Sequence, residues 1–278
     1  MFINPDQIKS KIVVALDVDS KDDALKLVHE LKGHVGLFKV GLELIYSEGI
    51  GIIQEINDLG GKVFLDCKFQ DIPHTVAGAS KAVTRLNVKM FNVHTMGGIE
   101  MMRAAVSAVD NESARLKIER PLILGVTVLT SVNQSTFNQE LRIIGTIEEQ
   151  VAHLATLAGE AGLDGVIASP HEIEAIRKVS KDLVIVTPGV RPTWAASQDQ
   201  KRIMTPEEAV LRGASYLVIG RPITAPPVKI GTPSEAARKI VSDISNALER
   251  KEKKHADRKK TTTSFKFIRY RSHQVRCV

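Results

Sequence analysis

An acid, a lysine and a second acid lie close together in one short stretch of the sequence. Asp66 and Lys68 are two residues apart, and Asp71 follows three residues later, just before a proline-led segment. On a β-strand, residues two apart point to the same side, so Asp66 and Lys68 would share a face while Cys67 points the other way. Asp71 falls beyond the strand, on a loop that can reach a neighbouring subunit. The spacing alone allows two interpretations: a reactive charge cluster, or a local salt bridge followed by an Asp turn.

Other short apolar runs also end in polar residues. Asp17, Lys39 and His94 each close such a run, as do Thr130 and Ser169. A charge at the end of an apolar run is costly to desolvate unless it is paired or used, although one boundary charge usually meets solvent. The first four runs all end in this way. In barrels of parallel strands the active site gathers at the carboxyl ends of the strands, so we expect these side chains to converge.

Two glycine and arginine pairs indicate an anion site. Pro188 and Gly189 precede Arg191 after the seventh apolar run, and Gly220 precedes Arg221 after the eighth. Barrels often hold a phosphate group in the loops after strands seven and eight, where glycine lets backbone N–H groups approach the anion. Arginine adds a fixed, bidentate charge. A single such glycine would indicate only a tight turn, whereas two pairs at these positions favour phosphate binding.

The remaining chemistry-bearing residues give weaker signals. His74, His153 and His171 fall in helical segments and are interpreted as surface or packing residues. No His, Cys and carboxylate set has metal-ligand spacing, so we expect no protein-bound metal. Cys67 is expected to face away from the site and no G-x-S-x-G motif is present, which leaves no obvious covalent nucleophile. The stretch 190–202 around Trp194 has the length typical of a lid.

The elements that position these residues follow a repeating strand and helix pattern. The apolar runs are continuous rather than alternating, as expected for parallel strands covered on both faces. The predicted strands are residues 11–17, 35–41, 62–68, 88–94, 122–130, 165–169, 184–189 and 216–221. Amphipathic segments between them include residues 24–31, 50–59, 99–109 and 147–161. Ser169, Thr205 and Thr232 each precede a proline and stand three residues before a glutamate, which indicates helix starts.

This pattern predicts an α/β protein whose residues 1–248 form a single (β/α)8 barrel, with a basic extension, expected to be flexible, over residues 249–278. A doubly wound sheet is the structural alternative. It is weakened because no G-x-G-x-x-G follows any predicted strand.

The charge of the 278 residues is unevenly distributed. The chain has a formal net charge of +6. Residues 249–278 hold 11 Lys and Arg against three acidic residues, or +8, which leaves 27 basic and 29 acidic residues, or −2, in residues 1–248. The body therefore loses the electrostatic argument for nucleic-acid binding, and only 4% aromatic residues leave few stacking platforms.

The same composition bounds the class of protein. An apolar share of 43% is ordinary for a folded chain. No apolar run approaches the length of a membrane span, and residues 1–11 lack the apolar centre of a signal peptide. Two cysteines do not make a disulfide or zinc framework. We therefore expect a cytoplasmic protein with no membrane partner.

Seven short motifs lie in order between residues 13 and 247, each at a predicted strand end or in its loop. They are ALD (15–17), FKVG (38–41), FLDCKFQDIPHT (64–75), VTVLTS (126–131), PGVRP (188–192), DQKRIMTP (199–206) and VIGRPIT (218–224). Each motif alone is weak, but all seven in this order are highly specific. Together they resemble the orotidine 5′-monophosphate decarboxylase family.

The resemblance implies a reaction and an arrangement of subunits. Members of this family convert orotidine monophosphate to uridine monophosphate and CO2 as homodimers of barrels, without cofactor or metal. By position, Lys39, Asp66, Lys68 and the partner subunit's Asp71 resemble the family's alternating charge network. Lys68 resembles the residue that protonates C6 of the pyrimidine.

The resemblance also implies the substrate contacts. Asp17, Lys39 and the partner subunit's Thr75 match contacts to the ribose hydroxyls. Thr130 matches the hydroxyl that meets the pyrimidine amide, with Ser131 as the alternative. The implied substrate-binding set is completed, mainly around the phosphate, by Pro188, Arg191, Gln200, Gly220 and Arg221. His74 stands where many relatives carry Asn, so it is given no chemical role.

Two rival functions are compatible with parts of the sequence. A metal-dependent decarboxylase or aldolase acting on a sugar phosphate can share the D-x-K-x-x-D motif, but it needs further acidic ligands at strand ends, and Thr130, Ser131 and Gln200 favour a pyrimidine nucleotide. Alternatively, the basic tail could bind nucleic acid or an anionic membrane. The plainer interpretation of the tail is a solvated extension.

Overall fold

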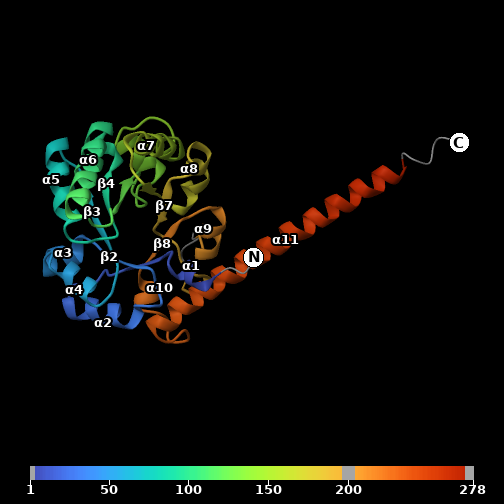
Figure 1. Ribbon diagram of the computed structural model, residues 1–278, viewed down its shortest axis with the longest axis horizontal. Helices are drawn as coiled ribbons and strands as arrows, with labels where there is room; N and C mark the ends of the chain where they lie inside the picture. Colours follow the sequence, from blue (N-terminus) through green and yellow to red (C-terminus); the bar gives the residue numbers. More distant parts are fainter. Residues whose placement is uncertain (1–3, 196–203, 273–278) are drawn as a thin grey trace.

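The apolar runs pair in parallel, each with its neighbours along the chain, and close on themselves. A computed structural model describes residues 4–195 and 204–272. Within these residues eight strands form a closed barrel in the order β1 to β8, with β1 also paired to β8 (Figure 1). The strands are β1 (Ile12–Ala15), β2 (Leu37–Val40), β3 (Val63–Phe69), β4 (Met90–His94), β5 (Leu122–Val126), β6 (Gly165–Ile167), β7 (Val184–Thr187) and β8 (Tyr216–Ile219). The predicted (β/α)8 barrel is confirmed.

Helices connect the strands and cover the outside of the barrel (Figure 1). The α-helices are α1 (Pro5–Lys9), α2 (Lys21–Leu31), α3 (Leu42–Glu48), α4 (Ile52–Asp58), α5 (Pro73–Thr84), α6 (Ile99–Leu116), α7 (Ile147–Ala161), α8 (Ile173–Val179), α9 (Pro206–Arg212), α10 (Arg221–Thr224) and α11 (Pro233–Ser272). Short 3-10 turns are η1 (Thr95–Gly97), η3 (Pro170–Glu172) and η4 (Thr193–Ala195), and η2 (Thr136–Glu140) is a π-turn.

Helix starts follow the predicted capping signals. Thr205 accepts a hydrogen bond from the Glu208 backbone, and the Glu208 carboxylate accepts one from the Thr205 backbone, so α9 begins with a reciprocal capping box. Thr232 and Glu235 do the same before α11. The signal at Ser169 opens the 3-10 turn η3 rather than an α-helix, and α8 follows it.

Strand periodicity separates two apolar cores. Alternate residues point into the barrel, where Val13, Leu37, Phe64 and Met90 belong to one buried cluster. The residues between them pack outward against the helices in a larger cluster. The same alternation places Asp17, Lys39, Asp66 and Asn92 at inward positions, one step beyond the apolar layer.

Helix α11 crosses the predicted domain boundary. It contains 40 residues, and Ala236, Ile240 and Ile244 in its first part are buried. In Figure 1 its second part extends away from the barrel. The backbone is helical on both sides of residue 249, so the division into a barrel and a tail stays a prediction. In the part of the chain that the structure describes, no helix is both long and apolar enough to cross a membrane.

Candidate active site

Four charged side chains from three strands form an alternating chain at the carboxyl ends of β1, β2 and β3. Lys39 Nζ lies 2.9 Å from Asp17 Oδ1 and 3.5 Å from Asp66 Oδ2. Lys68 Nζ lies 2.6 Å from Asp66 Oδ1. Asp66 is therefore shared by two lysines from different strands. The sequence left open a purely local salt bridge, and the contact with Lys39 makes the pair part of a larger cluster.

The centre of this cluster is shielded from water. The side chains of Lys39 and Asp66 are 12% and 14% exposed. Burial alone would raise the pKa of Asp66, but the Lys39 ammonium and the hydrogen bonds from Lys68 and Asn92 outweigh it and hold the pKa below its ordinary value. Asp66 is thus an ionised carboxylate at neutral pH, compensated on both sides.

Strand β3 is irregular where it carries this pair. Leu65 pairs with Phe91 and Phe69 with Val93, so β3 has two more residues than β4 over this interval. Lys68 has a φ of 50°. This left-handed conformation costs a non-glycine residue about 1–2 kcal/mol. The bulge and the unusual backbone angle bring the Lys68 ammonium back toward Asp66.

Asn92 on β4 fills the gap that the bulge leaves. Its Oδ1 accepts a hydrogen bond from the Lys68 backbone N–H at 2.6 Å, and its Nδ2 donates to Asp66 Oδ1 at 2.7 Å. Asn92 is not among the site residues predicted from the sequence. The available signal was an amide at an inward position of an otherwise apolar strand, one step before His94.

Two neighbours of the cluster carry no charge at neutral pH. Burial lowers the pKa of His94, and the nearby Lys68 ammonium lowers it further against an opposing effect of Asp66. Burial raises the pKa of the Cys67 thiol to about 12. Cys67 packs against the outer core, which confirms that it faces away from the site.

A cavity of about 200 Å³ adjoins the cluster inside the barrel mouth. Lys39, Asp66 and Lys68 form its charged side. Its remaining lining is mostly apolar and consists of Phe64, Val126, Val128, Leu129, Thr130, Ile167, Ala168, Pro188 and Val218. Of the two candidate hydroxyls, Thr130 is among the lining residues and Ser131 is not. The predicted contact Pro188 also lines the cavity.

The predicted phosphate residues Arg191, Gly220 and Arg221 follow β7 and β8, outside this lining. Gly189 has a φ of 79°, which favours glycine, and the Arg191 backbone N–H donates to Met204 O. Gly220 precedes α10, and a Cβ built there would lie 3.7 Å from Asp17 Oδ2, so the end of β8 adjoins the charge cluster. Arg221 is the first residue of α10.

The predicted lid is described only in part. Its first residues include η4, where the half-buried Trp194 packs against the larger, outward-facing core and its buried Nε1 has no hydrogen-bond partner among the described atoms. Residues 196–203, including the predicted phosphate contact Gln200, lie outside the described residues.

Asp71 and Thr75 do not enter the site of their own chain. Both are exposed, Asp71 on the loop after β3 and Thr75 in the first turn of α5. The Asp71 carboxylate accepts a hydrogen bond from the Ile72 N–H at 2.6 Å. Neither residue lines the cavity.

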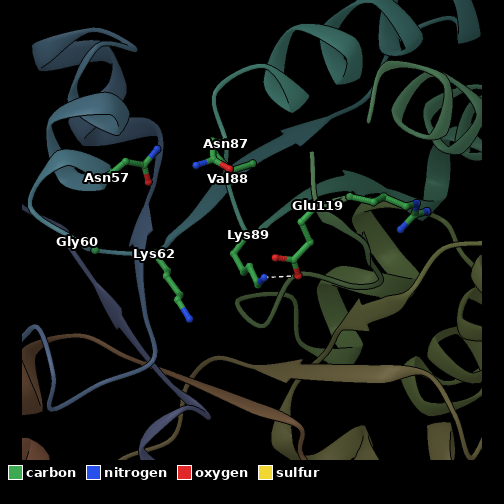
Figure 2. A pocket seen from close by; sticks show the side chains of 9 residues that line it. Asn57, Gly60, Lys62, Asn87, Val88, Lys89 and Glu119 are labelled. Carbon is green, nitrogen blue, oxygen red and sulfur yellow. Dashed lines mark hydrogen bonds and ion pairs between the residues drawn. The ribbon is translucent and has the colours of Figure 1, made fainter. Parts of the chain in front are cut away.

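A second pocket, of about 230 Å³, lies at the opposite end of the barrel, among the segments that precede β3, β4 and β5. Figure 2 shows its side chains, with Lys89 paired to Glu119. Arg120 is paired to Asp164 at 2.7 Å. Charges at this end of such barrels ordinarily serve stability rather than chemistry. The candidate active site is therefore the cavity beside Lys39, Asp66 and Lys68.

Over residues 4–195 and 204–254, whose side chains the structure describes, no group of three or more His, Cys, Asp or Glu side chains is placed to hold a metal ion.

Comparison with known proteins gives concordant results. The family described as "Orotidine 5'-phosphate decarboxylase / HUMPS family" matches residues 10–240. The orotidine 5′-phosphate decarboxylase of Syntrophomonas wolfei is 50% identical over 240 residues, covering 86% of this chain and 99% of the relative. That of Moorella thermoacetica is 52% identical over 237 residues, covering 85% and 92%.

A solved structure extends the likeness to three dimensions. The crystal structure of orotidine 5′-phosphate decarboxylase from Lactobacillus acidophilus superposes with a TM-score of 0.73 at 34% identity, covering 84% of this chain and 98% of that one. Among the described residues that carry the resemblance in the sequence, Lys39, Asp66 and Lys68 lie at the mouth of the same kind of barrel. The chain belongs to the orotidine 5′-phosphate decarboxylase / HUMPS family.

Proposed function

We propose that this enzyme decarboxylates orotidine 5′-monophosphate to uridine 5′-monophosphate and CO2, a step of pyrimidine biosynthesis. Family membership and relatives at about 50% identity support the reaction class. The observation that carries the proposal is the alternating Asp17, Lys39, Asp66 and Lys68 chain against a small, largely apolar cavity. The rival sugar-phosphate and tail-binding functions gain no support from these relatives.

Lys68 is the proposed proton donor. Loss of CO2 leaves the bonding electron pair on C6 of the pyrimidine as a carbanion. The Lys68 ammonium, held 2.6 Å from Asp66, stabilises that charge as it develops and then transfers a proton to C6. Because the ammonium is already oriented, little reorganisation accompanies the reaction.

Asp66 has a second proposed role beside the substrate carboxylate. A pKa below the ordinary value keeps Asp66 ionised, so it repels the substrate carboxylate in the ground state. That repulsion disappears as CO2 leaves. Lys39 compensates the negative charge of Asp66 from the other side. Without it, the site would carry too much negative charge to bind an anionic substrate.

The other proposed contacts surround the cavity. Asp17 and Lys39 bind the ribose hydroxyls, and Thr130 meets the pyrimidine amide, a role in which its place in the lining favours it over Ser131. The phosphate group is bound by Arg191, Gly220 and Arg221, which follow β7 and β8, together with Gln200, which lies outside the described residues. Binding energy from this remote group supports ordering of the site around the reacting carbon.

The proposed enzyme is a homodimer. Leu42, Ile72 and Met96 follow β2, β3 and β4, and they are 46%, 66% and 49% exposed at the same end of the barrel. A second copy covering these apolar side chains would bring the partner subunit's Asp71 and the partner subunit's Thr75 to the cavity. We place the dimer in the cytoplasm, since its proposed substrate is a phosphorylated nucleotide that does not cross membranes unaided.

The direct test is consumption of orotidine monophosphate, followed by absorbance in the presence of EDTA. We expect uridine monophosphate and CO2 to form at the same rate with and without the chelator. A folded protein that leaves orotidine monophosphate unchanged would refute the proposed function. Metal-dependent cleavage of a sugar phosphate, abolished by EDTA, with orotidine monophosphate left unchanged, would favour the sugar-phosphate rival.

A further inference from the structure

Asn92 is a polar side chain at an inward position of the barrel wall. Met90, two residues earlier, belongs to the inner apolar cluster, while Phe91 and Val93 pack outward. Asn92 itself is 0% exposed. A buried amide is destabilising unless its donor and acceptor groups are satisfied. Its partners therefore indicate why an amide occupies this position.

Both ends of the Asn92 amide bond to the reactive segment of β3. Oδ1 accepts from the Lys68 backbone N–H, and Nδ2 donates to Asp66 Oδ1. The orientation is unambiguous, since a backbone N–H only donates and an ionised carboxylate only accepts. The backbone carbonyl oxygen of Asn92 also accepts a weak hydrogen bond from Cys67 Sγ at 3.4 Å. One residue thus contacts three consecutive residues of β3.

These contacts replace the regular strand ladder. The pairing of β3 with β4 shifts between Leu65 and Phe69, so ordinary register does not fix Asp66 and Lys68. Lys68 also holds a φ of 50°, which a lysine rarely adopts without restraint. The backbone N–H of Lys68 itself donates the hydrogen bond to Asn92 Oδ1, so this bond acts directly on the strained residue.

We propose that Asn92 is a positioning residue, which holds the Lys68 backbone in its left-handed conformation and fixes the Asp66 carboxylate against the Lys68 ammonium. The proposal rests on the proposed decarboxylase function for its kinetic consequence. Asn92 does not line the cavity, so its effect passes through Asp66 and Lys68. An amide serves both bonds at once, whereas a carboxylate must be protonated to donate to Asp66.

The first test compares Asn92→Ala with Thr95→Val. Thr95 Oγ1 donates a buried 2.7 Å bond to Val126 O just beyond β4, so its removal also breaks a buried hydrogen bond but leaves Asp66 and Lys68 untouched. We expect Asn92→Ala to lower kcat at least about a hundredfold with KM changed less than about threefold, as for loss of oriented charge. Thr95→Val should keep kcat within about threefold. A kcat for Asn92→Ala close to that of the wild type, or an equal loss in Thr95→Val, would overturn the proposal.

Asn92→Asp supplies a pH signature that a merely structural role would not give. Its carboxyl group restores the donor to Asp66 only when protonated. The ratio of its kcat to that of the wild type should therefore rise at least about tenfold as pH falls from 9 to 6. A flat ratio would contradict a positioning role, and this variant decides the matter if Asn92→Ala does not fold.

A crystal structure of the same variants separates this inference from the proposed function. In Asn92→Ala or Asn92→Asp at high pH, Lys68 should leave the left-handed region and its ammonium should move away from Asp66. An unchanged Lys68 backbone conformation together with an unchanged distance from the Lys68 ammonium to Asp66 would refute the proposal, whatever the substrate is. Wild-type protein that does not consume orotidine monophosphate would refute the function while leaving this structural result to stand or fall alone.

Discussion

Lys39 and Lys68 share one carboxylate, Asp66, so the electrostatic environment of each of these three side chains depends on the other two. Asp66 lies 3.5 Å from one ammonium and 2.6 Å from the other. Removing either lysine would leave Asp66 buried with less compensation. Removing Asp66 would leave two ammonium groups facing each other across the site. The four charges therefore act as a unit, and single substitutions should have effects that do not add.

Lys68→Ala tests the proposed proton donor. We expect turnover of orotidine monophosphate to fall at least about a thousandfold, because both proton transfer and charge stabilisation at C6 are lost. Binding of uridine monophosphate, measured by calorimetry, should change far less, since the proposed phosphate contacts Arg191, Gly220 and Arg221 lie in the segments after β7 and β8.

The control for this experiment is Lys26→Ala, which removes an exposed lysine on α2. It should leave turnover unchanged. Near-normal turnover by Lys68→Ala would remove Lys68 from the proposed role.

The sequence predicted individual site residues only where local geometry decides their direction. Two-residue spacing correctly placed Asp66 and Lys68 together and turned Cys67 outward. Asn92 escaped notice because its role depends on a register shift between β3 and β4, which no local pattern records. Asp71 and Thr75 are exposed in their own chain, so the role proposed for them requires a second copy.

At the element scale, every predicted strand is present, but most are shorter than predicted. Strand β5 ends at Val126, whereas the apolar pattern continues to Thr130. Strand β7 ends at Thr187, before Pro188 and Gly189. The extra apolar residues line the cavity or the loops around it, where burial rather than pairing explains their character. Hydrophobicity thus predicted the elements well and their carboxyl ends poorly.

Capping residues give the loops a pH dependence of their own. Burial raises the pKa of Glu172 to about 7, partly opposed by the hydrogen bond from the Ser169 N–H and reinforced by the nearby Glu148. The folded state thus binds a proton that the unfolded state releases near pH 4.5. The contribution of Glu172 to the free energy of unfolding is therefore greatest below about pH 4.5, and it declines as the pH rises to about 7.

Glu172→Gln should remove that decline. Relative to the wild type, we expect its thermal midpoint to rise between pH 4.5 and pH 8, equivalent to about 1 kcal/mol or more. Glu149→Gln is the matched comparison, because the hydrogen bond from the Thr146 N–H lowers the pKa of Glu149 in the capping box of α7. The thermal midpoint of Glu149→Gln, relative to the wild type, should not rise over the same pH range. Parallel pH curves for Glu172→Gln and the wild type would contradict the assignment.

At the scale of the whole molecule, the proposed dimer can be tested by mixing inactive subunits. Asp71→Ala and Lys68→Ala chains, once exchanged, form mixed dimers in which one site has its own Lys68 and the partner subunit's Asp71. Random exchange should restore about a quarter of wild-type activity.

The control mixture combines Lys68→Ala with Asp66→Asn. Both substitutions lie in residues that each site takes from its own chain, so no mixed dimer has an intact site. We expect no recovery. Equal recovery in both mixtures, or none in the first after verified exchange, would count against a shared site.

The division between the barrel and the basic tail can be tested by ending the chain at Lys254. Residues 255–278 carry seven basic residues and one acidic residue, so their removal takes the formal net charge from +6 to zero. Over residues 233–254, the part of α11 whose side chains the structure describes, buried residues extend only to Ala247. We expect kcat to be unchanged and the thermal midpoint to shift by less than about 2 °C, since surface changes rarely exceed about 0.5 kcal/mol.

The full-length and truncated proteins also test whether the basic tail binds polyanions. Retention on a cation exchanger at pH 7 should fall sharply after truncation. Nucleic-acid binding that survives truncation would place the basic surface within residues 1–254, despite their formal net charge of zero.

A helix as long as α11 has a hydrodynamic consequence. Its 40 residues span about 60 Å, and its second part extends away from the barrel (Figure 1). A particle with this projection diffuses more slowly than a sphere of equal mass, so on a gel-filtration column a single chain of 30.4 kDa would elute early, toward the position of a compact dimer. Subunit number should therefore be determined by light scattering or sedimentation equilibrium, which report mass independently of shape.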